Sequence, residues 1–231
     1  SLATADKFLF LGYQPWQFTH AVFGDAYLTS WIDWIYSKWV VLLYLSVLCF
    51  AVFAPRYDRA RFFLSYGASW LLIGVVGAYL LPSAGPCYTF ITGPVSTPDF
   101  LPLMERLKEI HEDSYRLQAW AWQDVLWRAH SHKIYAFAFG ISAMPSMHNA
   151  IAVLYALSAA RLGKWIGIAA WPYAALIFIG SIHLGWHYAL DGLVAAPLTV
   201  GLWVLCGRVA DWLAKGESLA GEPVPAGSAL G

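Results

Sequence analysis

The feature that most constrains this fold is a set of apolar runs, each close to the length of a membrane span. Four of them cover residues 36–53, 62–81, 165–182 and 190–209. About twenty apolar residues are needed for a helix to cross the hydrocarbon core of a bilayer. Since lipid offers the backbone no hydrogen-bond partner, runs of this length cross as helices. The sequence therefore predicts an all-α protein, a polytopic membrane helical bundle.

A fifth run, residues 148–160, is shorter and consists of small apolar residues. It reaches spanning length only if it begins near Met144, which places Ser146 and His148 in its first turn. We therefore predict about five transmembrane helices plus interfacial helices. Residues 1–34 and 100–135 mix charged and aromatic side chains, as interfacial helices do. The first could equally be a frayed end, and the second an ordinary solvated helix.

Three regions follow from this pattern. We predict an N-terminal interfacial segment over residues 1–34, a transmembrane domain over residues 35–215, and a disordered tail over residues 216–231. The tail is rich in Gly, Pro, Ala and Ser, and such segments bury too little apolar surface to fold.

Composition excludes several classes of protein. The chain is 59% apolar and 12% charged, with a mean hydropathy of +0.55, whereas a soluble domain carries about twice that share of charge. Its formal net charge is zero, so no basic surface is predicted for nucleic acid. Cys49 and Cys206 lie in apolar runs and Cys87 stands alone, which excludes a disulfide framework or a cysteine zinc site.

Basic residues predict the orientation of the helices, because cytoplasmic loops are enriched in Lys and Arg. Such residues fill the first loop, the loop between the third and fourth runs, and the end of the last run: Arg56, Arg59, Arg61, Arg161, Lys164, Arg208 and Lys215. We expect these positions to be cytoplasmic. Residues 82–143 then lie on the opposite, non-cytoplasmic face.

This topology brings His148, His187 and Asp191 to the same non-cytoplasmic edge. A spacing of four residues puts His187 and Asp191 on one helix face, so the carboxylate can orient one ring nitrogen and leave the other free. A histidine so prepared can act as a nucleophile, and His148 can serve as general acid and base. Ser146, with the free N–H groups of a helix start, forms either a phosphate cradle or simply a helix cap.

Two motifs carry a family resemblance. Pro145-Ser146-Met147-His148, followed by Leu184-Gly185-Trp186-His187-Tyr188 and then Asp191, resembles the second and third signature motifs of the PAP2 (type 2 phosphatidic acid phosphatase) superfamily. Within it the chain is most similar to the branch of the inositol phosphorylceramide synthases. The loop Gly85-Pro86-Cys87-Tyr88, and Gly140, also resemble that branch. The resemblance implies that His187 forms a phosphohistidine, that Asp191 orients it, and that His148 transfers protons, without a cofactor.

The chain also departs from the phosphatases of that superfamily. Their basic first motif is missing, and Ser181 stands where they carry an arginine, six residues before the nucleophile. A phosphomonoester carries nearly two charges and calls for arginine contacts, so the loss favours a phosphodiester substrate. Arg128 and Lys133 lie on the correct side to substitute, although ordinary interfacial basic residues also lie there. The candidate substrate-binding residues are Ser146, Ser181, His183, Tyr188, Lys133 and Arg128.

A metal site is the competing interpretation of the same stripe. His183, His187 and Asp191 follow one another at four-residue spacing, which can also bind a metal ion. No Glu or Cys ligand lies nearby, and His187 with Asp191 fits a metal-free mechanism. We therefore predict no metal, and expect His183 to support the site or face the substrate.

The predicted function is an integral membrane lipid phosphotransferase that moves a phospho-headgroup between lipids through a phosphohistidine. The alternative is a PAP2-type phosphatase acting on phosphatidic acid or a polyprenyl (pyro)phosphate. A non-enzymatic ion or metal transporter is disfavoured because no inverted repeat is visible. Membrane lipids are the expected partners, nucleic acid is not, and the sequence predicts no oligomeric state.

Overall fold

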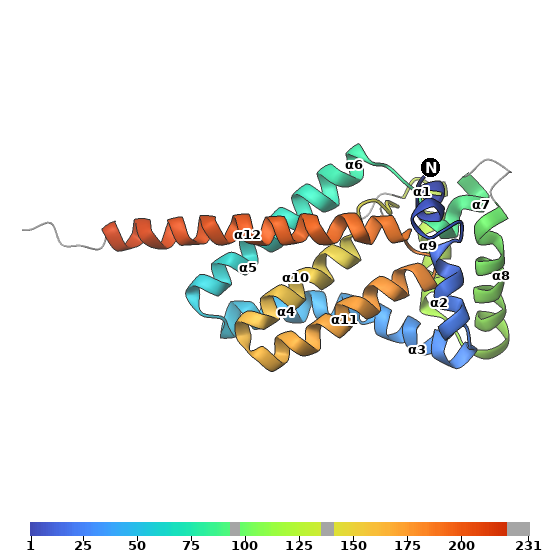
Figure 1. The fold of residues 1–231 in the computed structure, drawn as a ribbon, viewed down its shortest axis with the longest axis horizontal. Coiled ribbons are helices and arrows are strands. Elements are labelled where there is room, and N and C mark those ends of the chain that lie inside the picture. The colour runs from blue at the N-terminus through green and yellow to red at the C-terminus, as the bar shows by residue number, and fades with distance from the viewer. Residues whose placement is uncertain (93–97, 135–140, 221–231) are drawn as a thin grey trace, which may run out of the picture.

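The computed structural model describes residues 1–92, 98–134 and 141–220, and this part of the chain contains helices and no strand. Long helices run side by side as a bundle (Figure 1). They are α3 (Ala26–Ser37) with α4 (Trp39–Phe53), α5 (Arg56–Ala68) with η1 (Ser69–Gly77) and α6 (Ala78–Leu80), α10 (Met147–Leu162), α11 (Lys164–His183) and α12 (Ala189–Ala220). The prediction of an all-α membrane bundle is confirmed.

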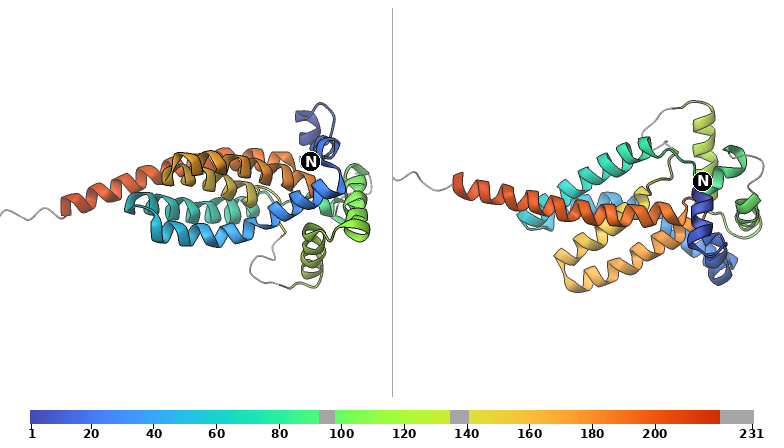
Figure 2. Two further views of the ribbon diagram at one scale, coloured as in Figure 1. Left: turned by 90° about the horizontal axis from the view of Figure 1, so that it is seen from below. Right: turned by 45° about the horizontal axis from the view of Figure 1, so that its top comes forward.

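Shorter elements gather at one end of the bundle, as the two views in Figure 2 show. They are α1 (Leu2–Leu9), α2 (Pro15–Phe23), η2 (Pro86–Tyr88), α7 (Thr89–Thr92), η3 (Pro98–Phe100), α8 (Leu101–Glu109), η4 (Ile110–Ser114) and α9 (Gln118–Ser131). This end also receives the end of α11 and the starts of α10 and α12.

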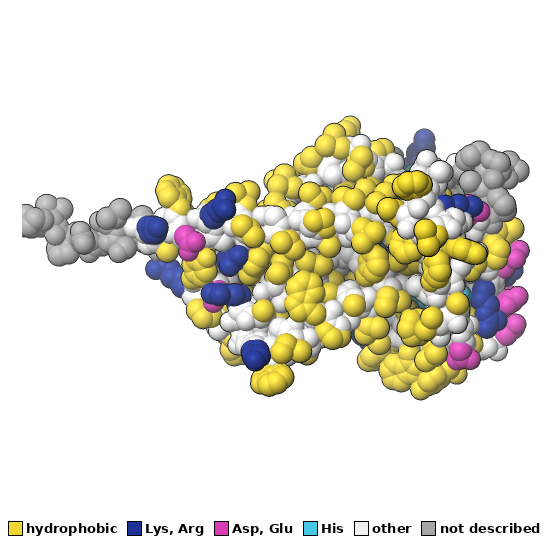
Figure 3. Space-filling view, in the orientation of Figure 1, with side chains coloured by type: hydrophobic (Ala, Val, Ile, Leu, Met, Phe, Trp, Pro, Cys, Tyr) yellow, Lys and Arg dark blue, Asp and Glu magenta, His cyan; other side chains and the backbone are white. Residues whose placement is uncertain are grey.

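Within the described ranges, four helical segments are long and apolar enough to cross a membrane: Ala26–Phe53, Arg56–Leu80, Lys164–His183 and Ala189–Lys215. Apolar side chains cover the middle of the molecule, and charged side chains gather toward its two ends (Figure 3). The predicted fifth span corresponds to α10, which has 16 residues and lies among the other helices. At 1.5 Å per residue it is about 24 Å long, shorter than the hydrocarbon core. A fifth crossing therefore stays a prediction.

The first long helix begins earlier than predicted. Asp25 caps α3 by accepting hydrogen bonds from the N–H groups of Tyr27 and Leu28, and α3 continues through Lys38 into α4. Asp33 lies inside α3, and its carboxylate accepts hydrogen bonds from the first two backbone N–H groups of α9. Residues 26–34 thus belong to the first long helix and not to a separate interfacial segment.

The last helix ends later than predicted. α12 continues to Ala220, so residues 216–220 are helical and not part of a tail. Residues 221–231, where the rest of the disordered tail was predicted, lie outside the described residues.

Small residues allow α10 to sit in the centre of the bundle. Ala150, Ala152 and Ala156 of α10 are fully buried. Where α11 begins, a Cβ on Gly167 would lie 2.7 Å from the Cα of Ala160, closer than packed atoms allow. Such close backbone approach is typical of helices that pack in membranes. It holds α10 and α11 together, so that the start of α10 and the end of α11 meet at the same end of the bundle.

Candidate active site

The turn between α11 and α12 is a Schellman motif centred on Gly185. The N–H of Trp186 donates to the carbonyl of Ser181 (3.0 Å), and the N–H of Gly185 donates to that of Ile182 (3.1 Å). Gly185 has φ = +73°, the left-handed conformation that glycine adopts without the strain other residues pay. The chain therefore leaves α11 abruptly, and the next two residues present His187.

Two carboxylates hold the start of α12. Asp191 accepts a hydrogen bond from the N–H of Tyr188 (2.9 Å), and Asp6 of α1 accepts from Ala189 (2.8 Å) and Leu190 (3.0 Å). The first N–H groups of a helix have no partner within it, so these bonds satisfy groups that would otherwise be unpaired. They fix the backbone on which Asp191 stands.

Ser146 holds the start of α10. Its hydroxyl accepts from the backbone N–H (3.3 Å) and the side-chain amide (3.0 Å) of Asn149, so it is the helix cap. The N–H of Ser146 donates to the carbonyl of Asp191 (3.3 Å), which ties the starts of α10 and α12 together. Ser146 is fully buried, and its described contacts are those of a cap.

These elements bring His148, His187 and Asp191 together. His187 Nδ1 lies 2.9 Å from the carbonyl oxygen of Ala143 and 3.4 Å from Asp191 Oδ2. Its Nε2 lies 3.4 Å from His148 Nδ1. Since both neighbours of His187 Nδ1 are acceptors, we assign the proton of the neutral ring to Nδ1. The lone pair of Nε2 then points toward His148.

The surroundings of this group are largely buried and aromatic. His187 is 6% exposed and Asp191 is fully buried, and among the described residues Asp191 Oδ1 has no hydrogen-bond partner. The ring of His148 stacks on Tyr36 at 4.9 Å and lies 4.3 Å from the ring of Trp39. Charge interactions are strengthened where water is excluded. Tyr36, Trp39 and the Ala143 carbonyl were not predicted as site groups, because no motif spacing connects them to the histidines.

Ser181 lies beside this group in a neutral network. Its hydroxyl accepts from the Asn149 side-chain amide (3.3 Å) and donates to the carbonyl of Phe178 (2.8 Å). Asn149 therefore joins Ser146 to Ser181. For the described residues, the contacts of His148, His187 and Asp191 come from ring, carbonyl and backbone N–H groups and from the Asp191 carboxylate itself, and none from Lys or Arg.

His183 is engaged elsewhere. It is fully buried, with Nδ1 3.2 Å from the hydroxyl of Thr19 and Nε2 3.0 Å from that of Thr29. Its ring stacks on His20 at 4.0 Å. These contacts leave neither ring nitrogen free for a substrate, and they join α11 to α2 and α3. The stripe of His183, His187 and Asp191 is not gathered around one point, and no three His, Cys, Asp or Glu side chains in the described ranges form a metal-binding group.

The other candidate substrate-binding residues have their own surroundings. Arg128 is exposed and pairs with Asp124 on α9 at 2.8 Å. Lys133 is exposed just after α9. Tyr188 is 7% exposed and meets Phe100 edge to face at 5.6 Å. None of the three has a described contact with His187 or His148.

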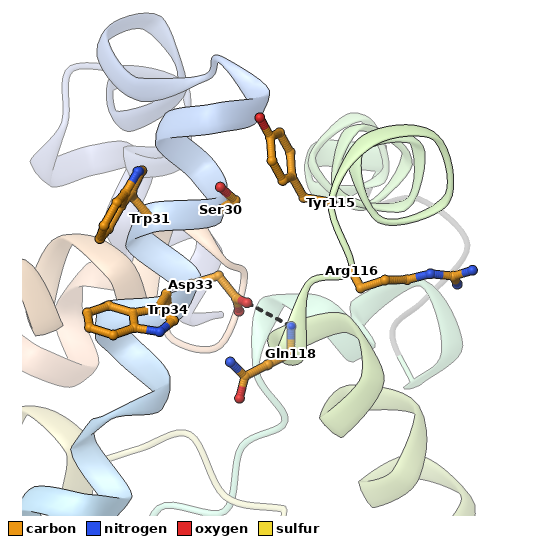
Figure 4. Close-up of a pocket in the computed structure, with 7 residues that line it drawn as sticks. All are labelled: Ser30, Trp31, Asp33, Trp34, Tyr115, Arg116 and Gln118. Carbon is orange, nitrogen blue, oxygen red and sulfur yellow. Dashed lines mark hydrogen bonds between the residues drawn. The ribbon is translucent and has the colours of Figure 1, made fainter.

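Two pockets open at this end. One of about 360 Å³ is lined by Ser1, Leu2, Leu81, Pro82, Ser83, Ala84, Met144 and Tyr188, the residue that follows His187. The other, of about 290 Å³, lies between α3 and the chain entering α9 and includes Asp33 and Arg116 (Figure 4). Its lining does not include the two histidines.

Comparison with protein families matches residues 1–205 to the PAP2 superfamily. No curated protein and no solved structure gave a match.

Proposed function

Because this chain belongs to the PAP2 superfamily, we propose that it is an integral membrane enzyme that transfers a phosphorylated headgroup from one lipid to another. The observation that carries the proposal is the approach of His187 Nε2 to His148 Nδ1 at 3.4 Å, with His187 Nδ1 facing the Ala143 carbonyl and Asp191. One nitrogen of His187 is held as a donor, and the other, Nε2, faces His148 and carries the lone pair that attacks phosphorus.

The first half-reaction forms a phosphohistidine. His187 Nε2 attacks phosphorus, and the bond from phosphorus to the oxygen of the donor lipid breaks. His148, which enters this step protonated, gives its proton to that oxygen. The lipid part of the donor therefore leaves as a neutral alcohol, and the phosphorylated headgroup stays on His187. Asp191 faces the Nδ1 side of His187 and stabilises the positive charge that the ring gains.

The second half-reaction regenerates the enzyme. His148, now neutral, takes the proton of an acceptor hydroxyl, and the resulting oxygen attacks phosphorus. The bond from phosphorus to His187 Nε2 breaks, which restores both histidines to their starting states. Water as acceptor would make the same chemistry a phosphatase, so the acceptor decides between the two reactions.

The neutral network of Ser181, Asn149 and Ser146 supports a phosphodiester as the donor. A diester carries one negative charge and a monoester nearly two, and the described contacts of the two histidines include no Lys or Arg. One charge-assisted hydrogen bond is worth about 2 kcal/mol, or roughly thirtyfold in rate. A dianion is therefore held less well here than in a site with a fixed arginine.

The inositol phosphorylceramide synthase branch remains our preferred relative. The loop that resembles this branch meets the turn that presents His187, since the N–H of Cys87 donates to the carbonyl of Gly185 at 2.9 Å. A Cβ on Gly85 would collide with the carbonyl of Trp186. Gly140, the other point of resemblance, lies outside the described residues.

The test compares two donors with purified protein in lipid nanodiscs. We expect headgroup transfer from phosphatidylinositol to ceramide, or to labelled diacylglycerol, to exceed release of inorganic phosphate from phosphatidic acid. Faster phosphate release from phosphatidic acid would overturn transfer in favour of a phosphatase.

The nucleophile is tested separately. His187→Ala should abolish the acid-labile phosphoprotein, whereas His132→Ala, at an exposed position after α9, should leave it unchanged. Equal phosphoprotein yields from wild type and His187→Ala would refute the mechanism.

A further inference from the structure

Asp6 is a buried carboxylate that reaches a helix far away in the chain. It is 1% exposed, and its two oxygens accept the N–H groups of Ala189 and Leu190 at 2.8 and 3.0 Å. These two groups are the first of α12 and have no partner inside that helix. A carboxylate at this place is also favoured by the helix dipole.

The bond from Asp191 to the N–H of Tyr188 completes this arrangement. The N–H groups of residues 188, 189 and 190 are then all bound to carboxylates, and Asp191 is the next residue. Without Asp6, two N–H groups in the first turn of α12 lose their partner in a place with little water. That turn, with the Asp191 side chain, would no longer be fixed against His187.

Helix α1 is itself anchored, so it can serve as a support. Lys7 pairs with Asp99 of η3 at 2.8 Å, and Gln14 donates to the carbonyl of Ala3 at 3.2 Å. Burial raises the pKa of Asp6, the two N–H groups lower it, and the nearby charge of Asp191 raises it. The two carboxylates are thus close enough to interact.

We propose that Asp6 is a positioning residue for the reaction: by capping α12 it holds Asp191 against His187, although it touches neither substrate nor histidine. The proposal rests on the proposed function, in which His187 is the nucleophile. It assigns a role in catalysis to the N-terminal helix, which the catalytic motifs do not include.

Asp33 provides a matched control. It is 3% exposed and accepts the N–H groups of the first two residues of α9, Gln118 at 2.7 Å (Figure 4) and Ala119 at 2.8 Å. Asp33 therefore caps a helix with the same groups and at the same positions as Asp6. It differs in that α9 carries none of the three residues His148, His187 and Asp191.

The first measurement is hydrogen exchange, which tests the structural role of Asp6 and does not depend on enzyme activity. In nanodiscs, Asp6→Ala should speed hydrogen exchange in the peptide that contains Ala189 and Leu190, and Asp33→Ala should do so in the peptide that contains Gln118. Both should lower the midpoint of thermal unfolding. Unchanged exchange at residues 189–190 in Asp6→Ala would overturn the proposal.

The second measurement is the rate of phosphoprotein formation, which tests the effect of Asp6 on catalysis. We expect Asp6→Ala to slow phosphoprotein formation roughly tenfold or more, with KM changed less than about threefold, while Asp33→Ala slows it less than about threefold. In a background of Asp191→Asn, Asp6→Ala should cost less than about twofold, because the residue through which it acts is already lost. Equal slowing by Asp6→Ala in both backgrounds would show a general structural role and overturn the proposal.

Two safeguards keep the outcomes distinct. If Asp6→Ala does not fold, Asp6→Asn is used instead, because it keeps one acceptor oxygen and should fold. Its rate of phosphoprotein formation should lie between wild type and the loss expected for Asp6→Ala. A rate equal to wild type would overturn the positioning role of Asp6. If the wild-type protein forms no phosphoprotein, the proposed function fails, and the exchange measurement alone still decides whether Asp6 holds the start of α12.

Discussion

At the scale of single residues, His187 Nδ1 has two acceptors, and the main-chain carbonyl is the nearer one. The Ala143 oxygen lies at 2.9 Å and Asp191 Oδ2 at 3.4 Å. The carbonyl can therefore keep the proton on Nδ1 by itself, and the carboxylate adds a negative charge in a buried place. The expected contact between His187 and Asp191 is present, but it is longer than the contact between His187 and the Ala143 carbonyl.

This geometry sets the expected cost of Asp191→Asn. In a triad where the carboxylate alone fixes the tautomer, the amide costs about 10⁴-fold in kcat. Here the Ala143 carbonyl still holds the tautomer, so we expect a loss on the order of a hundredfold, about 2.7 kcal/mol. Single-turnover rates of phosphoprotein formation measure it. A loss near 10⁴-fold would mean that Asp191 sets the tautomer without help.

The buried ring of His20 makes the stability of the protein depend on pH. Burial is the largest cause that lowers its pKa below the ordinary 6.5, and the charge of Arg106 lowers the pKa further. The hydrogen bond to the His183 carbonyl acts in the opposite direction and is outweighed. As pH falls below about 6.5, the unfolded chain binds the proton first, so stability is full above that pH and is lost below it. His20→Gln keeps a donor toward the carbonyl and should flatten the acid side of the curve. An acid side as steep as that of wild type would contradict the assignment.

At the scale of elements, the turn from α11 to α12 places the nucleophile. Gly185 ends α11 in the left-handed conformation, and a Cβ there would also lie 3.3 Å from Met104 Sδ of α8. Because α8 packs on this turn, the chain cannot relieve the strain by moving outward.

Gly185→Ala should therefore destabilise the protein by about 1–2 kcal/mol and reduce turnover, since it moves His187. Gly201→Ala is the matched control, because nothing lies within 4 Å of its Cβ and α12 is already helical there. Thermal unfolding and transfer rates of both variants measure the effect. Equal values for Gly185→Ala and wild type would show that this turn does not need glycine.

At the scale of the whole molecule, the bundle has two different ends. The basic loops lie at the end away from the candidate site, while α1, α2, α8 and α9 cover the end that holds it (Figures 1 and 3). Because cytoplasmic loops are enriched in Lys and Arg, we expect the candidate site to face the non-cytoplasmic side.

Thiol labelling tests this orientation. In a variant without Cys49, Cys87 and Cys206, single cysteines replace Asp113, after α8, or Lys164, at the start of α11; both positions are exposed. An impermeant reagent added to intact cells should label Asp113→Cys and reach Lys164→Cys only after permeabilisation. The reverse pattern would place the site on the cytoplasmic side.

The sequence by itself determined what depends on local pattern. Apolar runs of spanning length predicted the helices, since a bilayer leaves such segments one way to satisfy their backbone. The four-residue spacing predicted one helix face for His187 and Asp191, whereas His187 lies in the turn before α12, which begins at Ala189. The two side chains still meet at 3.4 Å, because the turn and the first turn of the helix are set within a few residues. The predicted topology placed His148, His187 and Asp191 at one edge of the bundle, and in the structure the three lie together. Their catalytic roles stay predictions.

Only the tertiary structure decided which distant groups support that turn. Asp6 and Ala189 are 183 residues apart, and Asp33 and Gln118 are 85 apart. In the sequence these acids resembled the polar residues of an interfacial segment. Their buried bonds depend on how α1 and α3 lie against other helices, and no spacing records that. The same holds for His183, whose contacts with Thr19 and Thr29 join helices that no spacing in the sequence connects. A hydrogen bond between helices requires two backbones to be placed to within about half an ångström, and packing of the whole bundle, not local pattern, achieves this.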